Sequence, residues 1–179
     1  MSNYRCMGIS RLSKTLILVG LCMLLIPPFV SAATSSSPSS PKIKAEGYIL
    51  VDFNSGQVLA EKNADKRMEP ASLTKMMSSY VVAYEIENRG IELDDQVLVS
   101  KKAWRMKGSR MFIEVGKKIP LKQLLIGMIV QSGNDATIAL AEHVAKSEKT
   151  FVKMMNNHAR RLGMRDTHFE NSTGMPSKN

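Results

Sequence analysis

Residues 69–78 read EPASLTKMMS and place a serine and a lysine three positions apart at a predicted helix start. The pattern predicts a helix over about residues 72–87 that ends at Asn88-Arg89-Gly90. Helical spacing puts Lys75 one turn after Ser72 on the same face, within reach of its hydroxyl. A lysine with a lowered pKa can take the proton of a serine and activate it as a nucleophile, but serine is also a preferred helix cap. The motif alone leaves both interpretations open.

A second polar motif, Gln131-Ser132-Gly133-Asn134, separates two apolar segments that we predict to be helices, residues 121–130 and 135–146. Its side chains would therefore sit on a turn held by buried structure. By itself the motif indicates a helix–turn–helix connection in which Ser132 or Asn134 is a cap. Together with the serine–lysine pair, it strengthens the interpretation of Ser72 as a nucleophile.

The other predicted elements surround these motifs. Residues 47–53 and 57–61 are predicted to form a β-hairpin, because both runs are rich in β-formers and a turn of Asn54-Ser55-Gly56 joins them. We also expect a short strand at 96–100 and a less regular stretch at 101–109. A further helix is predicted at 149–162 and ends at Gly163. Its buried face carries Phe151, Met154, Met155 and Leu162.

The amino-terminal residues have the composition of an export signal. Cations precede an apolar run of 16 residues, Thr15–Val30, which small residues follow at positions 31–33. The run is shorter than a membrane span and ends in Pro27-Pro28, so we predict a signal peptide at 1–32, cleaved near Ala32 or Ala33. We expect a flexible Ser/Pro-rich tether at 33–45 and one domain at 46–179.

Charge and composition exclude several classes of function. Removal of the three leader cations would lower the formal net charge from +9 to +6, and the remaining charges of both signs are interspersed. No basic tract with interleaved aromatic residues is present, so we expect no nucleic-acid partner, whereas an anionic envelope surface or polymer is compatible. Both cysteines lie in the leader, so the mature chain would form no disulfide. His143, His158 and His168 lack ligand spacing, and we expect no metal and no cofactor.

Together with these motifs, further short segments of the chain resemble the penicillin-binding-protein and serine β-lactamase superfamily, and within it the D-alanyl-D-alanine carboxypeptidases. Ser132-Gly133-Asn134 is the form typical of that subfamily, whereas class A β-lactamases show S-D-N. The resemblance implies an α+β, β-lactamase/transpeptidase-like fold over about residues 47–176. The residues that carry it are Pro70-Ala71-Ser72-Leu73-Thr74-Lys75-Met76-Met77, Gly108-Ser109-Arg110-Met111-Phe112, Gln131-Ser132-Gly133-Asn134-Asp135-Ala136, Leu162-Gly163-Met164, Thr167-His168-Phe169 and Asn171.

The resemblance also implies a mechanism and a location. Ser72 would attack the carbonyl between the terminal D-alanines of a peptidoglycan stem peptide, with Lys75 as its base and its own N–H in the oxyanion hole. Ser132 would relay a proton to the departing D-alanine, and Asn134 would bind the substrate amide and hold Lys75. β-Lactam antibiotics would acylate the same serine. The enzyme would act in the periplasm or at the outer face of the cytoplasmic membrane, to which a longer form could attach through a carboxy-terminal amphipathic helix.

One departure from the superfamily pattern concerns its third motif, K-T-G, which does not occur before Asn179. We therefore expect an incomplete fold, with the amino-terminal hairpin and the helical region but without the later sheet strands, and a poorly active or inactive chain. One alternative to a carboxypeptidase or a related endopeptidase is a β-lactamase, for which residues 164–176 offer Glu170 as the only glutamate, without the usual setting of a deacylating residue. The other alternative is a non-catalytic truncated remnant.

Overall fold

The computed structural model describes residues 42–177. The predicted signal peptide at 1–32 and most of the predicted tether lie outside the described residues. The described residues divide into two compact units, with the boundary between Ala64 and Asp65. In the part of the chain that is described, no helix combines the length and the apolar character that a membrane crossing needs.

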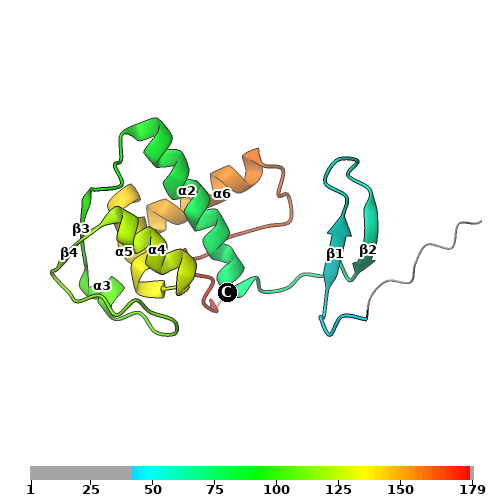
Figure 1. Ribbon diagram of the computed structural model, residues 1–179, viewed down its shortest axis with the longest axis horizontal. Helices are drawn as coiled ribbons and strands as arrows, with labels where there is room; N and C mark the ends of the chain where they lie inside the picture. The colour runs from blue at the N-terminus through cyan, green and yellow to red at the C-terminus, as the bar shows by residue number, and fades with distance from the viewer. Residues whose placement is uncertain (1–41, 178–179) are drawn as a thin grey trace, which may run out of the picture. The chain divides into compact units, whose positions relative to one another are not determined.

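The first unit contains the predicted hairpin (Figure 1). Strand β1 (Tyr48–Val51) pairs antiparallel with β2 (Val58–Lys62), with an irregularity in register between Leu50 and Val51. The turn is closed by Asp52, whose carboxylate accepts hydrogen bonds from the backbone N–H and the hydroxyl of Ser55. Most apolar side chains of the pair are exposed. A two-stranded hairpin with so little burial has marginal stability by itself.

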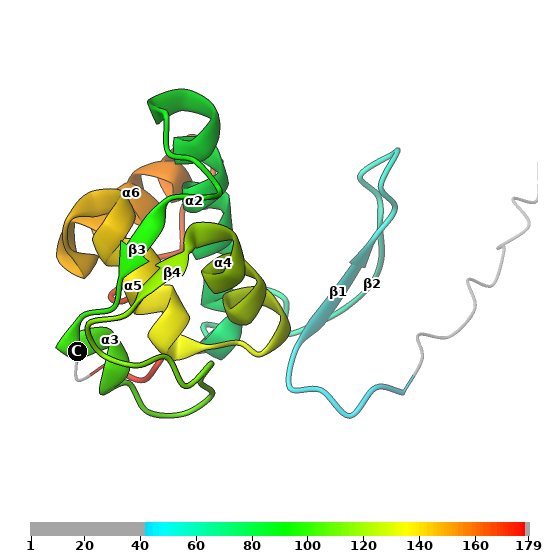
Figure 2. The same cartoon turned by 60° about the vertical axis from the view of Figure 1, so that its left-hand side comes forward.

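The second unit carries the two polar motifs on a helical framework with one short strand pair (Figures 1 and 2). Strands β3 and β4 pair antiparallel, with Val97 opposite Ile119. The elements in chain order are η1 (Ala71–Leu73, a 3-10 helix), α2 (Thr74–Arg89), β3 (Gln96–Leu98), α3 (Lys101–Trp104), β4 (Lys118–Pro120), α4 (Leu121–Val130), α5 (Asn134–Ala145) and α6 (Glu148–Arg161).

Several predicted boundaries were wrong in instructive ways. Ser72 lies in η1 rather than in α2, and neither helix has a side-chain cap. The stretch at 101–109 begins with a short helix, because the Ser100 hydroxyl accepts a hydrogen bond from the Ala103 N–H. Strand β4 was not predicted, since its residues 118–120 are too few to show a period. Leu162 follows α6 and is 52% exposed, so it lies outside the core.

Helix α5 lies at the centre of the second unit. It contacts α2, α3, α4, α6 and β3. All its residues from Asn134 to Ala141 are buried, and three of them are alanines, whose small side chains let neighbouring helices approach closely. A helix buried on all sides holds its amino terminus rigidly, and Ser132 and Gly133 directly precede that terminus.

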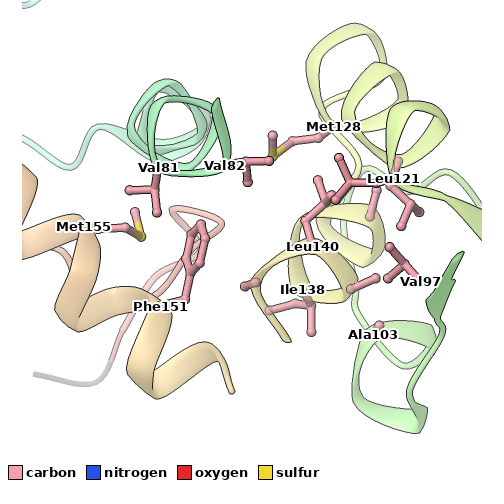
Figure 3. Packing of buried hydrophobic residues seen from close by; sticks show 14 of the residues in the cluster. Val81, Val82, Val97, Ala103, Leu121, Met128, Ile138, Leu140, Phe151 and Met155 are labelled. Carbon is pink, nitrogen blue, oxygen red and sulfur yellow. The ribbon is translucent and has the colours of Figure 1, made fainter. Parts of the chain in front are cut away.

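The core that supports the site packs α2 against α5 and α6. Figure 3 shows Val81 of α2 beside Phe151 and Met155 of α6, and Leu140 of α5 directed toward Leu121 of α4. These five side chains are at most 1% exposed. Burial of each one contributes roughly 1.5–3 kcal/mol to the free energy of unfolding. The predicted core positions on α6 are therefore confirmed for Phe151 and Met155.

Candidate active site

The two polar motifs meet at the amino terminus of α2. The Lys75 Nζ atom donates to the Ser72 Oγ atom at 3.2 Å, and the Ser132 hydroxyl donates to the same oxygen at 2.9 Å. Ser72 is exposed, whereas Lys75 is only 6% exposed. One accessible hydroxyl is thus in hydrogen-bond contact with an amine that is its candidate base and with a second hydroxyl that can move a proton.

Burial sets the basicity of the Lys75 amine. Desolvation lowers the pKa of Lys75 below its ordinary value, because a buried ammonium loses its hydration. Within residues 42–177, no carboxylate forms an ion pair with Lys75. Its other hydrogen-bond acceptor is the backbone carbonyl of Thr173, at 3.0 Å. An amine in this environment is neutral over a wider pH range than a surface lysine, and only the neutral form can accept a proton.

Backbone strain accompanies the two serines. Ala71, which precedes Ser72, has φ of 46°, and Ser132 has φ of 54°. A residue other than glycine rarely adopts positive φ, and such strain persists only when surrounding structure imposes it. Here the left-handed conformation of Ser132 accompanies the approach of its hydroxyl to Ser72, between the ends of α4 and α5.

Asn134 occupies the first position of α5 and is 3% exposed. Its side-chain nitrogen donates to the Lys107 carbonyl at 2.7 Å, and a Cβ on Gly108 would lie 2.9 Å from that nitrogen. We expected Asn134 to hold Lys75, but among the described residues the carbonyl of Thr173 takes that position. Binding of a substrate amide by Asn134 stays a prediction.

Asp135 fixes the segment that lies over the start of α5. Its carboxylate accepts hydrogen bonds from the Met111 N–H at 2.8 Å and from the Ile113 N–H at 3.3 Å, and the residue is 1% exposed. The sequence motif contained Asp135, but its function as a backbone anchor was not predicted. The available signal was an aspartate at the predicted start of a helix that is otherwise mostly apolar.

Asp135→Ala is expected to lower the free energy of unfolding by about 3 kcal/mol, because the backbone N–H groups of Met111 and Ile113 would lose their acceptor. Urea unfolding of the purified variant would measure the change. Asp166→Ala is the matched control, since Asp166 is exposed and should change stability by less than about 0.5 kcal/mol. Equal stability of the two variants would contradict the anchoring function.

The loop at 171–175 covers Lys75. The Asn171 side-chain oxygen accepts hydrogen bonds from the backbone N–H groups of Thr173 and Gly174, at 3.1 and 2.7 Å. The Ser172 carbonyl accepts from the Ser78 hydroxyl of α2 at 2.7 Å. The contact of this loop's backbone with Lys75 was not predicted. Asn171, an amide residue in a Ser/Thr/Gly-rich string, was the only signal.

Two cavities lie beside this cluster. One of about 300 Å³ is lined by residues that include Thr74, Glu170 and Gly174, and an apolar one of about 490 Å³ includes Leu73 and Thr74. Ser72 itself is exposed and is not among the lining residues of either cavity. Glu170 is exposed and lines the first cavity.

The histidines have other surroundings. His158 is buried and makes edge contacts with the rings of Tyr80 and Tyr84, and burial lowers its pKa. His143 lies 3.2 Å from the Asp95 carboxylate, and His168 is exposed. Across residues 42–177, no group of three or more His, Cys, Asp or Glu residues is arranged to hold a metal ion.

The chain is similar to known proteins over most of its length. A family model described as D-alanyl-D-alanine carboxypeptidase, peptidase S11, matches residues 33–179. The D-alanyl-D-alanine carboxypeptidase DacA of Escherichia coli (strain K12) is 42% identical over 170 residues, which cover 88% of this chain and 42% of that protein. The chain therefore spans less than half the length of this curated relative.

Solved structures show the same likeness. The D-alanyl-D-alanine carboxypeptidase DacD from Francisella tularensis matches with a TM-score of 0.75 and 40% identity, over 79% of this chain and 34% of that one. Penicillin binding protein 5 from Haemophilus influenzae matches with a TM-score of 0.75 and 39% identity, over 78% of this chain and 42% of that one. The predicted penicillin-binding, transpeptidase-like fold is confirmed, and the chain covers only part of it. Because the family model matches most of its residues, the chain belongs to the D-alanyl-D-alanine carboxypeptidase family, peptidase S11.

Proposed function

We propose that these residues belong to a serine-type D-alanyl-D-alanine carboxypeptidase in which Ser72 is the acylated residue. The observation that carries the proposal is the contact of Ser72 with a buried lysine that has no carboxylate partner among the described residues. A lysine of purely structural function would be expected to keep its charge in a salt bridge or in solvent. Here desolvation lowers the pKa of Lys75 and prepares the amine to accept a proton.

In the proposed reaction, neutral Lys75 takes the proton from the Ser72 hydroxyl. The Ser72 oxygen then attacks the carbonyl carbon between the two terminal D-alanines of a peptidoglycan stem peptide. The backbone N–H of Ser72 donates one hydrogen bond to the developing oxyanion. When the C–N bond breaks, Ser132 passes its hydroxyl proton to the leaving amine and regains a proton from the Lys75 ammonium, and the amine departs as D-alanine. Water then hydrolyses the ester on Ser72 and releases the shortened peptide.

The same proposal assigns the remaining partners and the location. β-Lactam antibiotics imitate the D-alanyl dipeptide and would acylate Ser72. Asn134 would bind the substrate amide at the edge of the site. The predicted signal peptide at 1–32 would direct export to the periplasm or the outer face of the cytoplasmic membrane, where the peptidoglycan substrate lies.

Labelled penicillin tests this proposal directly. Residues 33–179 would be joined to the carboxyl-terminal remainder of the E. coli relative, and this extended protein would be compared with the 179-residue chain. The extended protein should form a covalent adduct at Ser72, located by peptide mass spectrometry. Ser72→Ala should abolish the adduct, and Ser132→Ala should slow its formation by about 10²–10⁴-fold, since proton transfer contributes this much.

Ser79→Ala is the matched control, because Ser79 lies on the same helix and its hydroxyl donates only to the Lys75 backbone carbonyl. It should leave the labelling rate within about twofold of the parent. An extended protein that is folded by circular dichroism and forms no adduct at Ser72 would overturn the proposal.

A further inference from the structure

Glu148 is a charged residue outside the Ser72 cluster that contacts the loop covering Lys75. It is the first residue of α6, and its side chain is 13% exposed. One carboxylate oxygen accepts hydrogen bonds from the Ser172 N–H at 3.0 Å and from the Ser172 hydroxyl at 2.9 Å. The other oxygen forms an ion pair with Lys102 Nζ at 2.6 Å.

The opposite side of the same loop contacts α2. The Ser172 carbonyl accepts from the Ser78 hydroxyl, and the Thr173 carbonyl accepts from Lys75 Nζ. Ser172 is 0% exposed and Thr173 is 2% exposed. Two adjacent buried residues therefore connect the Glu148 carboxylate with the Lys75 amine through one peptide unit.

We infer that Glu148 is a positioning residue for the Ser72–Lys75 pair: it anchors Ser172 and so keeps the Thr173 carbonyl against the amine and water away from it. The inference rests on the function proposed for Ser72. No charged side chain among residues 42–177 pairs with Lys75, so the basicity of its amine depends on how well this loop excludes water. Displacement of the loop would hydrate the amine and favour its protonated form.

The side chain of Glu148 is an ionised carboxylate when it accepts the hydrogen bonds from Ser172. Burial raises its pKa, but the hydrogen bonds from Lys102 and Ser172 and the charge of Lys102 together outweigh that effect and hold the pKa of Glu148 below its usual range. A lowered carboxyl pKa means that the stabilisation is present above the unfolded-state pKa and is lost as the pH falls through the folded-state value. The anchor is therefore fully formed at neutral pH.

Three variants separate positioning of the loop from simple ion-pair stability. Glu148→Ala removes both interactions. Glu148→Gln keeps an oxygen that can accept from Ser172 but loses the charge pair. Lys102→Met loses the charge pair and leaves the contacts with Ser172 intact. If the hydrogen bonds from Ser172 to residue 148 position the loop, Glu148→Ala should change the pKa of Lys75 and the acylation rate of Ser72. Glu148→Gln and Lys102→Met should leave both close to those of the parent.

The first measurement needs no enzymatic activity. The full 179-residue chain would be treated with acetic anhydride over a range of pH, and peptide mass spectrometry would follow acetylation of each lysine, with exposed Lys149 and Lys153 as internal references. Acetic anhydride reacts with neutral amines, so the pH dependence reports the pKa. In Glu148→Ala the midpoint for Lys75 should move to higher pH. An unchanged midpoint, or an equal shift in Lys102→Met, would overturn the inference.

The second measurement separates this inference from the function on which it rests. Labelled penicillin would react with the extended protein, and acylation of Ser72 by Glu148→Ala should be about tenfold slower at neutral pH, since one unit in the pKa of a base changes its neutral fraction tenfold. Glu148→Gln should recover most of the rate. If the parent acylates and Glu148→Ala acylates equally fast, only the inference fails. If the folded parent forms no adduct, the proposed function fails. The acetylation experiment still shows whether Glu148 controls the pKa of Lys75 through the loop.

Discussion

Lys75→Met should strongly slow acylation of Ser72 while the protein stays folded. The methionine cannot accept a proton, so the Ser72 hydroxyl would lose its candidate base, and the labelling rate should fall by about 10²–10⁴-fold. Methionine has a similar length and fills the same space without a buried amine. Removal of a buried amine raises the free energy of unfolding, whereas the loss of the donor to the Thr173 carbonyl lowers it, so the two effects oppose each other.

The free energy of unfolding should therefore change by less than about 2 kcal/mol in either direction. Labelled penicillin on the extended protein measures the rate, and urea unfolding measures the stability. Lys153→Met is the matched control, because the same substitution occurs at an exposed position of α6. Acylation at the parental rate in Lys75→Met would remove Lys75 from the mechanism.

Gly174→Ala should destabilise the protein and distort the site together. A Cβ on Gly174 would lie 1.8 Å from the Ala71 carbonyl oxygen and 2.7 Å from the Thr74 hydroxyl oxygen. Gly174 also has φ of 77°, which alanine adopts only with strain. The backbone of η1 would have to move, and we expect a loss of about 3 kcal/mol or more in the free energy of unfolding.

The same movement should slow acylation. Ala71 directly precedes Ser72, and a misplacement of about 1 Å at a reacting group can cost about 10²-fold in rate. Gly163→Ala is the control, because Gly163 has φ of 76° and a Cβ added there would meet no atom within 4 Å. That variant should lose only about 1 kcal/mol and retain its labelling rate. Similar losses in both variants would contradict close packing at Gly174.

Local spacing made part of this site predictable. Ser72 and Lys75 are three residues apart, a spacing at which one helical turn places two side chains on the same face. The apolar period of α6 likewise reflects the face that this helix buries, at Phe151 and Met155. The resemblance added Ser132 and Asn134, because these residue types occur in a recognisable order. The missed strand β4 shows the limit, since its pairing with β3 depends on residues about 20 positions away.

The sequence by itself determined the chemical groups of this protein: a serine, a lysine one helical turn away, and a polar turn between two apolar helices. Only the tertiary structure decided how basic the lysine is and what holds it. The acceptor of Lys75 is the backbone carbonyl of Thr173, 98 residues away, and the anchor of that loop is Glu148, 24 residues before Ser172. Every residue has a backbone carbonyl, so such a contact leaves no signal in residue type, and burial arises only when distant segments pack together.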